Sequence, residues 1–316
     1  MATFTSKIPI QKYSTDIYQL QVKTYALKLC KQTVPKEVLS ICWNCKSIFR
    51  AMFFDANELQ AIYRSEYIGM EIDVPDGGIV YQNNNFLNEN SARTLNLVKD
   101  IEFSYGVPIR DIFDIGGRDG FRMKGLAEKG YSCKVFDPIP CETCSPLIAK
   151  EYILCSDIGE REKADLIILG SMLEHCENPH ETIANCYAHL REGGFIFLDL
   201  PFDISAFFEW FFLRRWIGKT IGADFTHNVF YSRRAVQSLL ARHGIATLSG
   251  KFNTVASYKG TVLLEVLGRK VYPKDDMSKY KKWRSLDFDL LNLRYCLSIL
   301  YRIVKKIASI WRWCGC

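Results

Sequence analysis

The chain has 316 residues, of which 48% are hydrophobic and 24% are charged, enough for one large core and an appendage. No run approaches the roughly 18 apolar residues of a membrane-spanning helix, and the N-terminal residues lack the apolar segment of a secretory signal. The net charge of +6 is low for a nucleic-acid-binding protein. We therefore expect a cytoplasmic protein whose twelve cysteines are reduced.

Residues 1–90 are predicted to form a small cysteine-bearing module. Cys42 and Cys45 have the C-x-x-C spacing of a zinc knuckle, whereas a structural zinc site takes four ligands. Cys30 adds a third thiol, and residues 1–60 contain no histidine that could complete the set. A degenerate ribbon packed without metal is therefore the preferred prediction, and a zinc site is its alternative.

The most informative segment is the glycine turn Asp114-Ile-Gly-Gly-Arg-Asp-Gly120. An apolar, strand-like run precedes it and a helix-like segment over residues 121–129 follows, as in a nucleotide-binding βαβ unit. Asp119 would repel a pyrophosphate but suits the cationic amino-acid end of a ligand, and Asp114 is a second carboxylate beside it. Asp137 follows roughly 20 residues later, where such units bind a ribose. The segment predicts a nucleoside-containing ligand.

The downstream segment continues the alternation of strands and helices. Residues 164–170 are an apolar run typical of a buried parallel strand, and Ser171-Met-Leu-Glu-His175 follows it. We expect a helix over residues 180–190, ended by Gly193-Gly194, and then a strand over residues 195–201. This order predicts an α/β fold with a doubly wound sheet.

An aromatic insert is predicted at residues 203–222, where residues 204–217 contain six aromatic side chains. In a doubly wound sheet such an insert would overhang the crevice at the carboxyl ends of the strands. Packing as a lid or in the core is preferred over lipid contact. The segment His227-Asn-Val-Phe-Tyr-Ser232 follows, and a helix is expected over residues 233–243.

Residues 285–316 are predicted to form an amphipathic helix with a basic polar face. Its apolar positions recur at three- and four-residue steps: Leu293, Leu297, Leu300, Val304, Ile307 and Trp311. Its basic residues occupy the remaining arc: Arg294, Arg302, Lys305, Lys306 and Arg312. This pattern favours binding to a membrane surface, and docking on the enzyme or on a second subunit is the alternative.

The motifs resemble those of class I S-adenosylmethionine-dependent methyltransferases. The glycine turn resembles their motif D/E-x-G-x-G-x-G, with Arg118 where a glycine is usual, and residues 171–179 resemble their L-E-H-x-x-x-P motif. Residues 42–67 resemble the N-terminal domain of sugar C-methyltransferases and related glycan or small-molecule methyltransferases. The resemblance implies S-adenosylmethionine as cofactor and a mostly parallel, seven-stranded sheet in a domain over residues 91–272.

The resemblance also assigns roles to individual residues. The acidic position of Asp157 commonly contacts the adenine amino group in this family, and the histidine at the position of His227 lies near the substrate pocket. His227 is thus the first candidate for the base that takes the acceptor proton, and His175 is the second. The implied cofactor-binding residues are Asp114, Gly116, Gly117, Asp119, Gly120, Asp137, Asp157, Ser171 and Glu174.

Three classes of function remain open at the level of sequence. The preferred one is a methyltransferase acting on a saccharide or lipid-linked glycan, peripheral to the cytoplasmic face of a membrane. The second methylates an apolar small molecule, with the aromatic insert as a pocket wall. The third is a non-catalytic protein that keeps the fold, and only Arg118 in the turn favours it. The sequence does not distinguish O- from C-methylation, nor does it fix the oligomeric state.

Overall fold

The computed structural model of the protein describes seven stretches of the chain: residues 17–22, 37–42, 47–50, 84–138, 142–201, 227–255 and 261–271. The predicted aromatic insert at residues 203–222 and the predicted helix at residues 285–316 lie outside these stretches. Among the helices that are described, none combines the length and the apolar character needed to cross a membrane.

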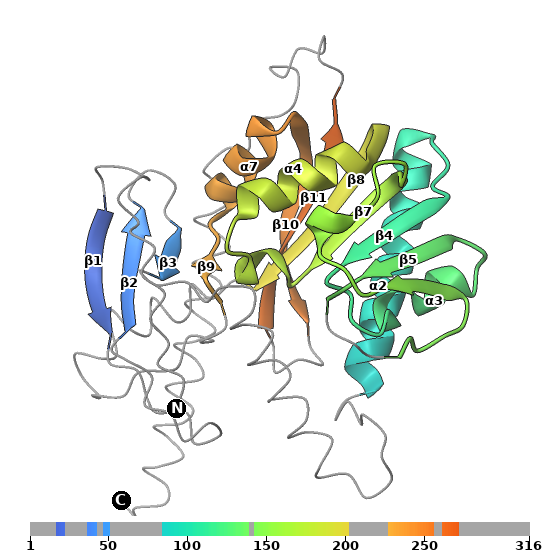
Figure 1. Ribbon diagram of the computed structural model, residues 1–316, viewed down its shortest axis with the longest axis horizontal. Coiled ribbons are helices and arrows are strands. Elements are labelled where there is room, and N and C mark those ends of the chain that lie inside the picture. The colour runs from blue at the N-terminus through green and yellow to red at the C-terminus, as the bar shows by residue number, and fades with distance from the viewer. Residues whose placement is uncertain are drawn as a thin grey trace, which may run out of the picture. The chain divides into compact units, whose positions relative to one another are not determined.

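A seven-stranded sheet with the order β10-β11-β8-β7-β4-β5-β6 forms the centre of the fold (Figure 1). Its parallel part consists of β4 (Asp111–Ile115), β5 (Ser132–Phe136), β6 (Ile148–Glu151), β7 (Ala164–Gly170) and β8 (Leu190–Pro201). Two antiparallel strands, β11 (Thr261–Lys270) and β10 (Ile245–Val255), extend it beyond β8. The predicted mostly parallel, seven-stranded sheet is confirmed.

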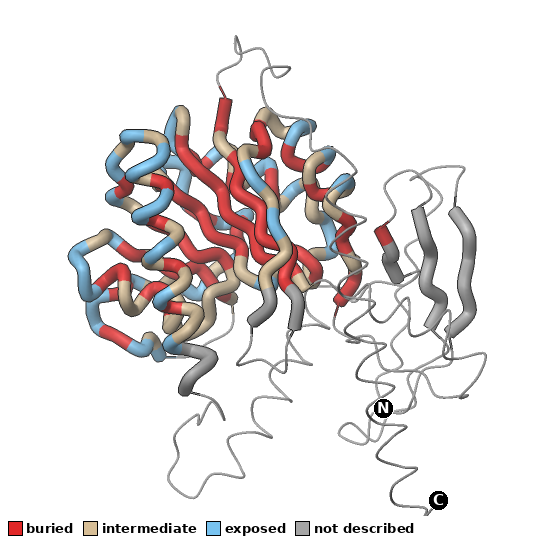
Figure 2. Tube along the Cα trace, turned by 180° about the vertical axis from the view of Figure 1, so that it is seen from behind, coloured by how far each residue is buried: buried red, intermediate tan, exposed pale blue. Residues whose placement is uncertain are grey.

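Both faces of this sheet are covered. Helices α2 (Asn84–Tyr105) and α3 (Lys124–Ala127) share one hydrophobic cluster with alternate residues of the strands, such as Ile112, Leu166 and Ile168. Because successive strand residues face opposite sides, Phe113 and Ile167 belong to the other face. Helices α4 (Pro179–His189) and α7 (Arg233–Arg242) pack against one another and supply buried side chains outside that cluster. Figure 2 shows the buried residues concentrated in the strands.

Gly193 and Gly194 do not end a helix, contrary to the prediction. Helix α4 ends at His189 and β8 begins at the next residue, so Gly193-Gly194 lie inside the strand instead of ending the helix. The register with β7 jumps there, which is the mark of a bulge, and Gly193 takes a left-handed φ of 73°. The bulge carries Arg191, whose guanidinium donates to Asp165 at 2.8 Å and to Asp111 at 2.6 Å. It thereby ties β8 to β7 and β4.

A second, antiparallel sheet has the order β1-β2-β3-β9. Its strands β1 (Ile17–Val22), β2 (Glu37–Cys42) and β3 (Ile48–Arg50) come from the predicted N-terminal module, and β9 (Val229–Phe230) comes from the predicted methyltransferase domain. The backbone N–H of Ser232 also donates to the hydroxyl of Ser47 at 3.0 Å. The zinc alternative stays a prediction, since Cys30 and Cys45 lie outside the described residues and the side chain of Cys42 is not described.

Candidate active site

The glycine turn after β4 is shaped by two close approaches of its backbone. Gly116 has a left-handed φ of 73°, and a Cβ there would lie 2.6 Å from the Cγ of Met172. A Cβ on Gly117 would lie 2.4 Å from the Oδ2 of Asp114. Larger residues cannot occupy either position without displacing these side chains. Arg118, at the position of the usual middle glycine, also adopts a left-handed φ of 52°, and it lines the adjoining cavity.

Side-chain acceptors fix the rest of the turn. The backbone N–H of Arg118 donates to the Oδ2 of Asp137 at 2.9 Å, which joins the turn to the end of β5. The Oδ1 of Asp119 accepts the backbone N–H of Phe121 at 3.0 Å, where the 3-10 helix η1 (Phe121–Met123) begins. The carboxylate of Asp119 therefore caps a local turn. Asp137, by contrast, faces the cavity while it holds the turn.

Asp114 lies beneath the turn and is almost completely buried. Within the part of the chain that the structure describes, neither of its carboxylate oxygens has a hydrogen-bond partner. Burial raises the pKa of Asp114 from its ordinary value of 3.8 to about 7; the nearby Arg122 opposes this, and Asp199, Asp137 and Asp119 add to it. A protonated Asp114 is thus the favoured form in mildly acidic solution.

Arg122 belongs to a buried ionic network that the sequence analysis missed. It donates to Asp199 of β8 at 2.6 Å, and its guanidinium packs over Gly170, where a Cβ would lie 2.4 Å from the Cζ. Arg93 of α2 bonds to Glu265 of β11 and lies 3.9 Å from Asp199. The available signal was an acidic residue inside each of two apolar strand sequences, FIFLDL and VLLEVL.

A cavity of about 430 Å³ opens at the carboxyl ends of β4, β5 and β7. This is the edge at which doubly wound sheets bind ligands, and its size is that of a pocket for a small molecule or cofactor. Its walls include the apolar side chains of Phe136, Ile153 and Leu154, and polar groups from the start of α4, such as Asn178 and Glu181. The cavity can therefore enclose an aromatic ring and still offer hydrogen bonds.

The predicted cofactor residues converge on this cavity but differ in their access to it. Three of them line the cavity: Gly116, Asp137 and Ser171. Three others complete the turn beside it: Gly117, Asp119 and Gly120. Two carboxylates, Asp114 and Glu174, are buried and do not line it. Asp157 is exposed at the end of the 3-10 helix η2 (Cys155–Asp157). Its Oδ1 accepts the hydroxyl of Ser156 at 3.0 Å, and Ser156 lines the cavity.

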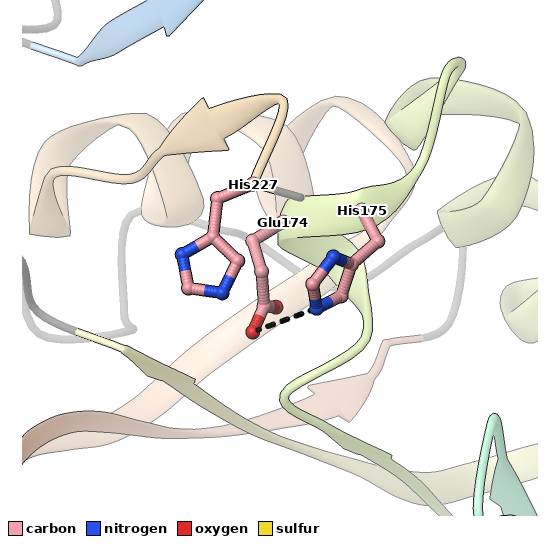
Figure 3. A group of neighbouring side chains, drawn as sticks. All are labelled: Glu174, His175 and His227. Carbon is pink, nitrogen blue, oxygen red and sulfur yellow. Dashed lines mark ion pairs between the residues drawn. The ribbon is translucent and has the colours of Figure 1, made fainter. Parts of the chain in front are cut away.

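The two candidate bases lie together at the edge of the cavity, with a carboxylate between them (Figure 3). Glu174 and His175 belong to the 3-10 helix η3 (Leu173–His175), and His227 lies two residues before β9. The rings of His175 and His227 meet edge to face with centroids 4.8 Å apart, and the Nε2 of His175 is 3.8 Å from the Oε1 of Glu174. Glu174 and His227 are buried, whereas His175 lines the cavity.

Asn228 holds the two segments of this cluster together. Its backbone N–H donates to the carbonyl of Glu174 at 2.7 Å, and its side-chain N–H donates to the carbonyl of His175 at 2.9 Å. The hydroxyl of Tyr231 adds a bond to the carbonyl of Leu173 at 3.5 Å. These contacts fix the main chain on both sides, so the cluster is pre-organised.

Comparison with known proteins agrees with this architecture. The Methyltransferase domain family matches residues 57–249, more than half of the chain. The chain therefore belongs to this family, and it is an S-adenosylmethionine-dependent methyltransferase of class I. A search of curated protein sequences finds no match.

Two solved structures illustrate the shared fold. The first is the Burkholderia thailandensis 1,6-didemethyltoxoflavin-N1-methyltransferase, solved with its substrate and S-adenosylhomocysteine; it is 15% identical with a TM-score of 0.50, over 76% of this chain and 98% of that one. The second is the magnesium protoporphyrin IX methyltransferase of Synechocystis PCC 6803, solved with S-adenosylhomocysteine; it is 12% identical with a TM-score of 0.50, over 68% and 100% of the two chains. At these identities the likeness concerns the fold.

The residues at the cavity fit S-adenosylmethionine. Gly116 brings the backbone of the turn to the cavity wall, Asp137 offers a carboxylate to ribose hydroxyls, and Phe136 and Leu154 offer apolar surface to an adenine. The buried carboxyl group of Asp114 lies beneath the turn, and a cationic amino group or sulfonium of a bound cofactor would favour its ionised form.

Replacing Asp137 by alanine should weaken the binding of S-adenosylmethionine at least tenfold. A charged acceptor of hydrogen bonds contributes about 1.5–3 kcal/mol, and the variant also loses the bond from the Arg118 N–H that positions the turn. Isothermal titration calorimetry measures the change, with circular dichroism as a check of the fold. An unchanged dissociation constant would remove Asp137 from the cofactor site.

Replacing Asp114 by asparagine should remove part of the pH dependence of stability. With its pKa raised to about 7, folded wild-type protein binds one more proton than unfolded chain between about pH 4 and pH 7. The contribution of Asp114 is therefore fully present below about pH 4 and is lost as the pH rises through 7. Urea denaturation of the cofactor-free protein should show the asparagine variant gaining stability relative to wild type from pH 5 to pH 8. A constant difference would contradict the raised pKa.

Proposed function

We propose that the protein transfers a methyl group from S-adenosylmethionine to a hydroxyl or a carbon of a saccharide or lipid-linked glycan. The cofactor, when bound, supplies an electrophilic methyl group on a sulfonium. The chain then has to align the acceptor and remove a proton from it. The observation that carries the proposal is the cluster of Glu174, His175 and His227 at the edge of the cavity.

His227 is the first candidate for proton removal because it is fixed by its neighbours and adjoins a carboxylate. His175 is the second, and it reaches the cavity directly. The sequence predicted His227 and His175 as alternative bases. The structure places both in one cluster, with their ring centroids 4.8 Å apart. A carboxylate beside a histidine can orient the ring and stabilise its cationic form after proton transfer.

The choice of a glycan acceptor is supported by the sequence resemblance and by the second sheet. Strand β9 begins two residues after His227 and pairs with β3 of the small N-terminal sheet. An acceptor bound beside His227 would thus lie close to the N-terminal sheet. We propose that this sheet contacts additional sugar residues of the acceptor. A methyltransferase for an apolar small molecule is the alternative function.

The acceptor class can be tested by comparing cells with and without the gene. Mass spectrometry of cell-surface glycans and of extracted lipids should show a methylated saccharide that disappears on deletion and returns with the wild-type gene. A gene carrying Asp137→Ala serves as the inactive control. Loss of a methylated quinone or other apolar metabolite, with all glycans unchanged, would favour the alternative function.

Replacing His227 by alanine should lower kcat by about 10²–10⁴-fold, the usual contribution of a positioned acid–base group. Cofactor affinity should stay at the wild-type value, because the cavity lining does not include His227. His243→Ala is a matched control: this histidine bonds to His180 at 3.1 Å and belongs to no carboxylate cluster. Wild-type turnover of His227→Ala would transfer the role to His175 or exclude a histidine base.

We also propose that the enzyme works at the cytoplasmic face of a membrane, held there by its basic C-terminal segment. Deleting residues 290–316 should move the protein from the membrane fraction to the soluble fraction and leave activity on a soluble acceptor intact. Each basic residue near an anionic surface contributes about 1 kcal/mol, and salt screens this attraction. Flotation with anionic liposomes at low and high salt tests the proposal. Full-length protein that never floats at low salt would contradict it.

A further inference from the structure

The cluster of Glu174, His175 and His227 has the composition of a metal site. Two imidazoles and one carboxylate are a ligand set that first-row divalent cations accept, with open positions left for water or a substrate. Within the part of the chain that the structure describes, this group brings one possible ligand atom from each of three side chains to within 4.8 Å of one another. Figure 3 shows the three side chains pointing toward a common region.

The geometry of the cluster is close to that of a bound site. Ligand atoms on neighbouring positions of a cation, with bonds of about 2.1 Å, are separated by roughly 3–3.5 Å. The Nε2 of His175 and the Oε1 of Glu174 are already 3.8 Å apart. Since all three ligand atoms lie within 4.8 Å of one another, shifts of less than about 1 Å would complete the coordination. Rotation of side chains is enough for such shifts.

Burial gives the cluster a further reason to bind a cation. The side chain of Glu174 is only 2% exposed, so little water screens the attraction between its carboxylate and a cation. His227 is 7% exposed, and the bonds from Asn228 to the carbonyls of Glu174 and His175 hold both segments in place. A pre-organised set of ligands loses little entropy when it binds an ion.

We propose that Glu174, His175 and His227 bind a divalent first-row transition cation at the edge of the cofactor cavity. Because His175 lines the cavity, the ion faces the space where the acceptor meets the methyl group. Nitrogen ligands select such an ion over Mg²⁺ or Ca²⁺, which prefer oxygen.

The role of this ion in catalysis rests on the proposed methyl transfer, whereas its binding does not. A hydroxyl of the acceptor would take an open position on the ion, which lowers the pKa of that hydroxyl. The proton leaves to water, and the oxygen's electron pair forms the bond to the methyl carbon. The pair of the broken carbon–sulfur bond stays on sulfur. With the ion bound, His175 and His227 act as its ligands and not as the base, so loss of His227 would lower turnover because the ion is lost.

Cobalt binding tests the site directly. Full-length, untagged protein is stripped with a chelator and titrated with Co²⁺, and binding is followed by calorimetry and by the visible absorption bands of the ion. Wild-type protein should bind one equivalent without the intense near-ultraviolet bands of thiolate ligation. Glu174→Gln and His227→Ala should each weaken binding at least tenfold, with folds verified by circular dichroism. Glutamine keeps the size of the side chain and removes its charge.

His243→Ala is the matched control, because it removes a histidine from the His180–His243 pair, which contains no carboxylate. It should bind cobalt as wild type does. The proposal is wrong if stripped wild-type protein binds no Co²⁺, if both cluster variants bind it with wild-type affinity, or if the bound ion shows thiolate bands. The last result would place the ion on cysteines.

Cofactor binding separates this inference from the proposed function. The stripped protein is titrated with S-adenosylhomocysteine in the absence of metal. If the nucleoside binds and cobalt does not, the metal site fails while the methyltransferase activity stands. If cobalt binds at the cluster and the nucleoside does not, the metal site stands and the proposed function fails.

Discussion

Parallel pairing of β4 with β5 and β7 is the constraint on which the site depends. The carboxyl ends of parallel strands lie at the same edge of the sheet, so the residues that follow these strands lie close together there. The backbone N–H of Gly116 continues the ladder to Phe136 at 2.8 Å, and that of Ser171 continues it to Asp199 at 2.8 Å. These bonds join residues 20 and 28 positions apart, and the pairing of β4 with β7 joins Ile112 to Leu166, 54 positions away, by main-chain bonds that side-chain substitutions leave in place.

Electrostatic compensation beneath the turn is the second constraint. The fold buries Asp114 without a hydrogen-bond partner among the described residues, while Arg122 nearby donates to Asp199. Buried charges of this kind cost stability when a partner is removed. A buried carboxyl group with a raised pKa beneath a cavity is typical of a functional site.

The sequence predicted the parallel strands well because their signal is local. The apolar run at residues 164–170 is β7 to the residue, since a buried strand needs apolar side chains on both faces. Gly193 was misassigned, because a glycine before a strand signals a helix end and a bulge equally well. The contact between His175 and His227 could not be predicted. It depends on the hydrogen bond from Asn228 to the carbonyl of His175 in the 3-10 helix, and such a bond produces no periodic pattern in the sequence. The same holds for the pairing of Arg93 with Glu265.

Strand β9 has a consequence for how the chain can be divided. It consists of Val229 and Phe230, and it is the outer strand of a sheet whose other members lie before residue 51. A domain boundary drawn from motifs alone, near residue 90, would sever this sheet and leave the loop that carries His227 without its lateral support. The segment that carries His227 is thus supported by strands from both parts of the chain. Recombination that exchanged the N-terminal strands would have to preserve the β3 edge, because Val229 and Phe230 pair with it two residues after His227.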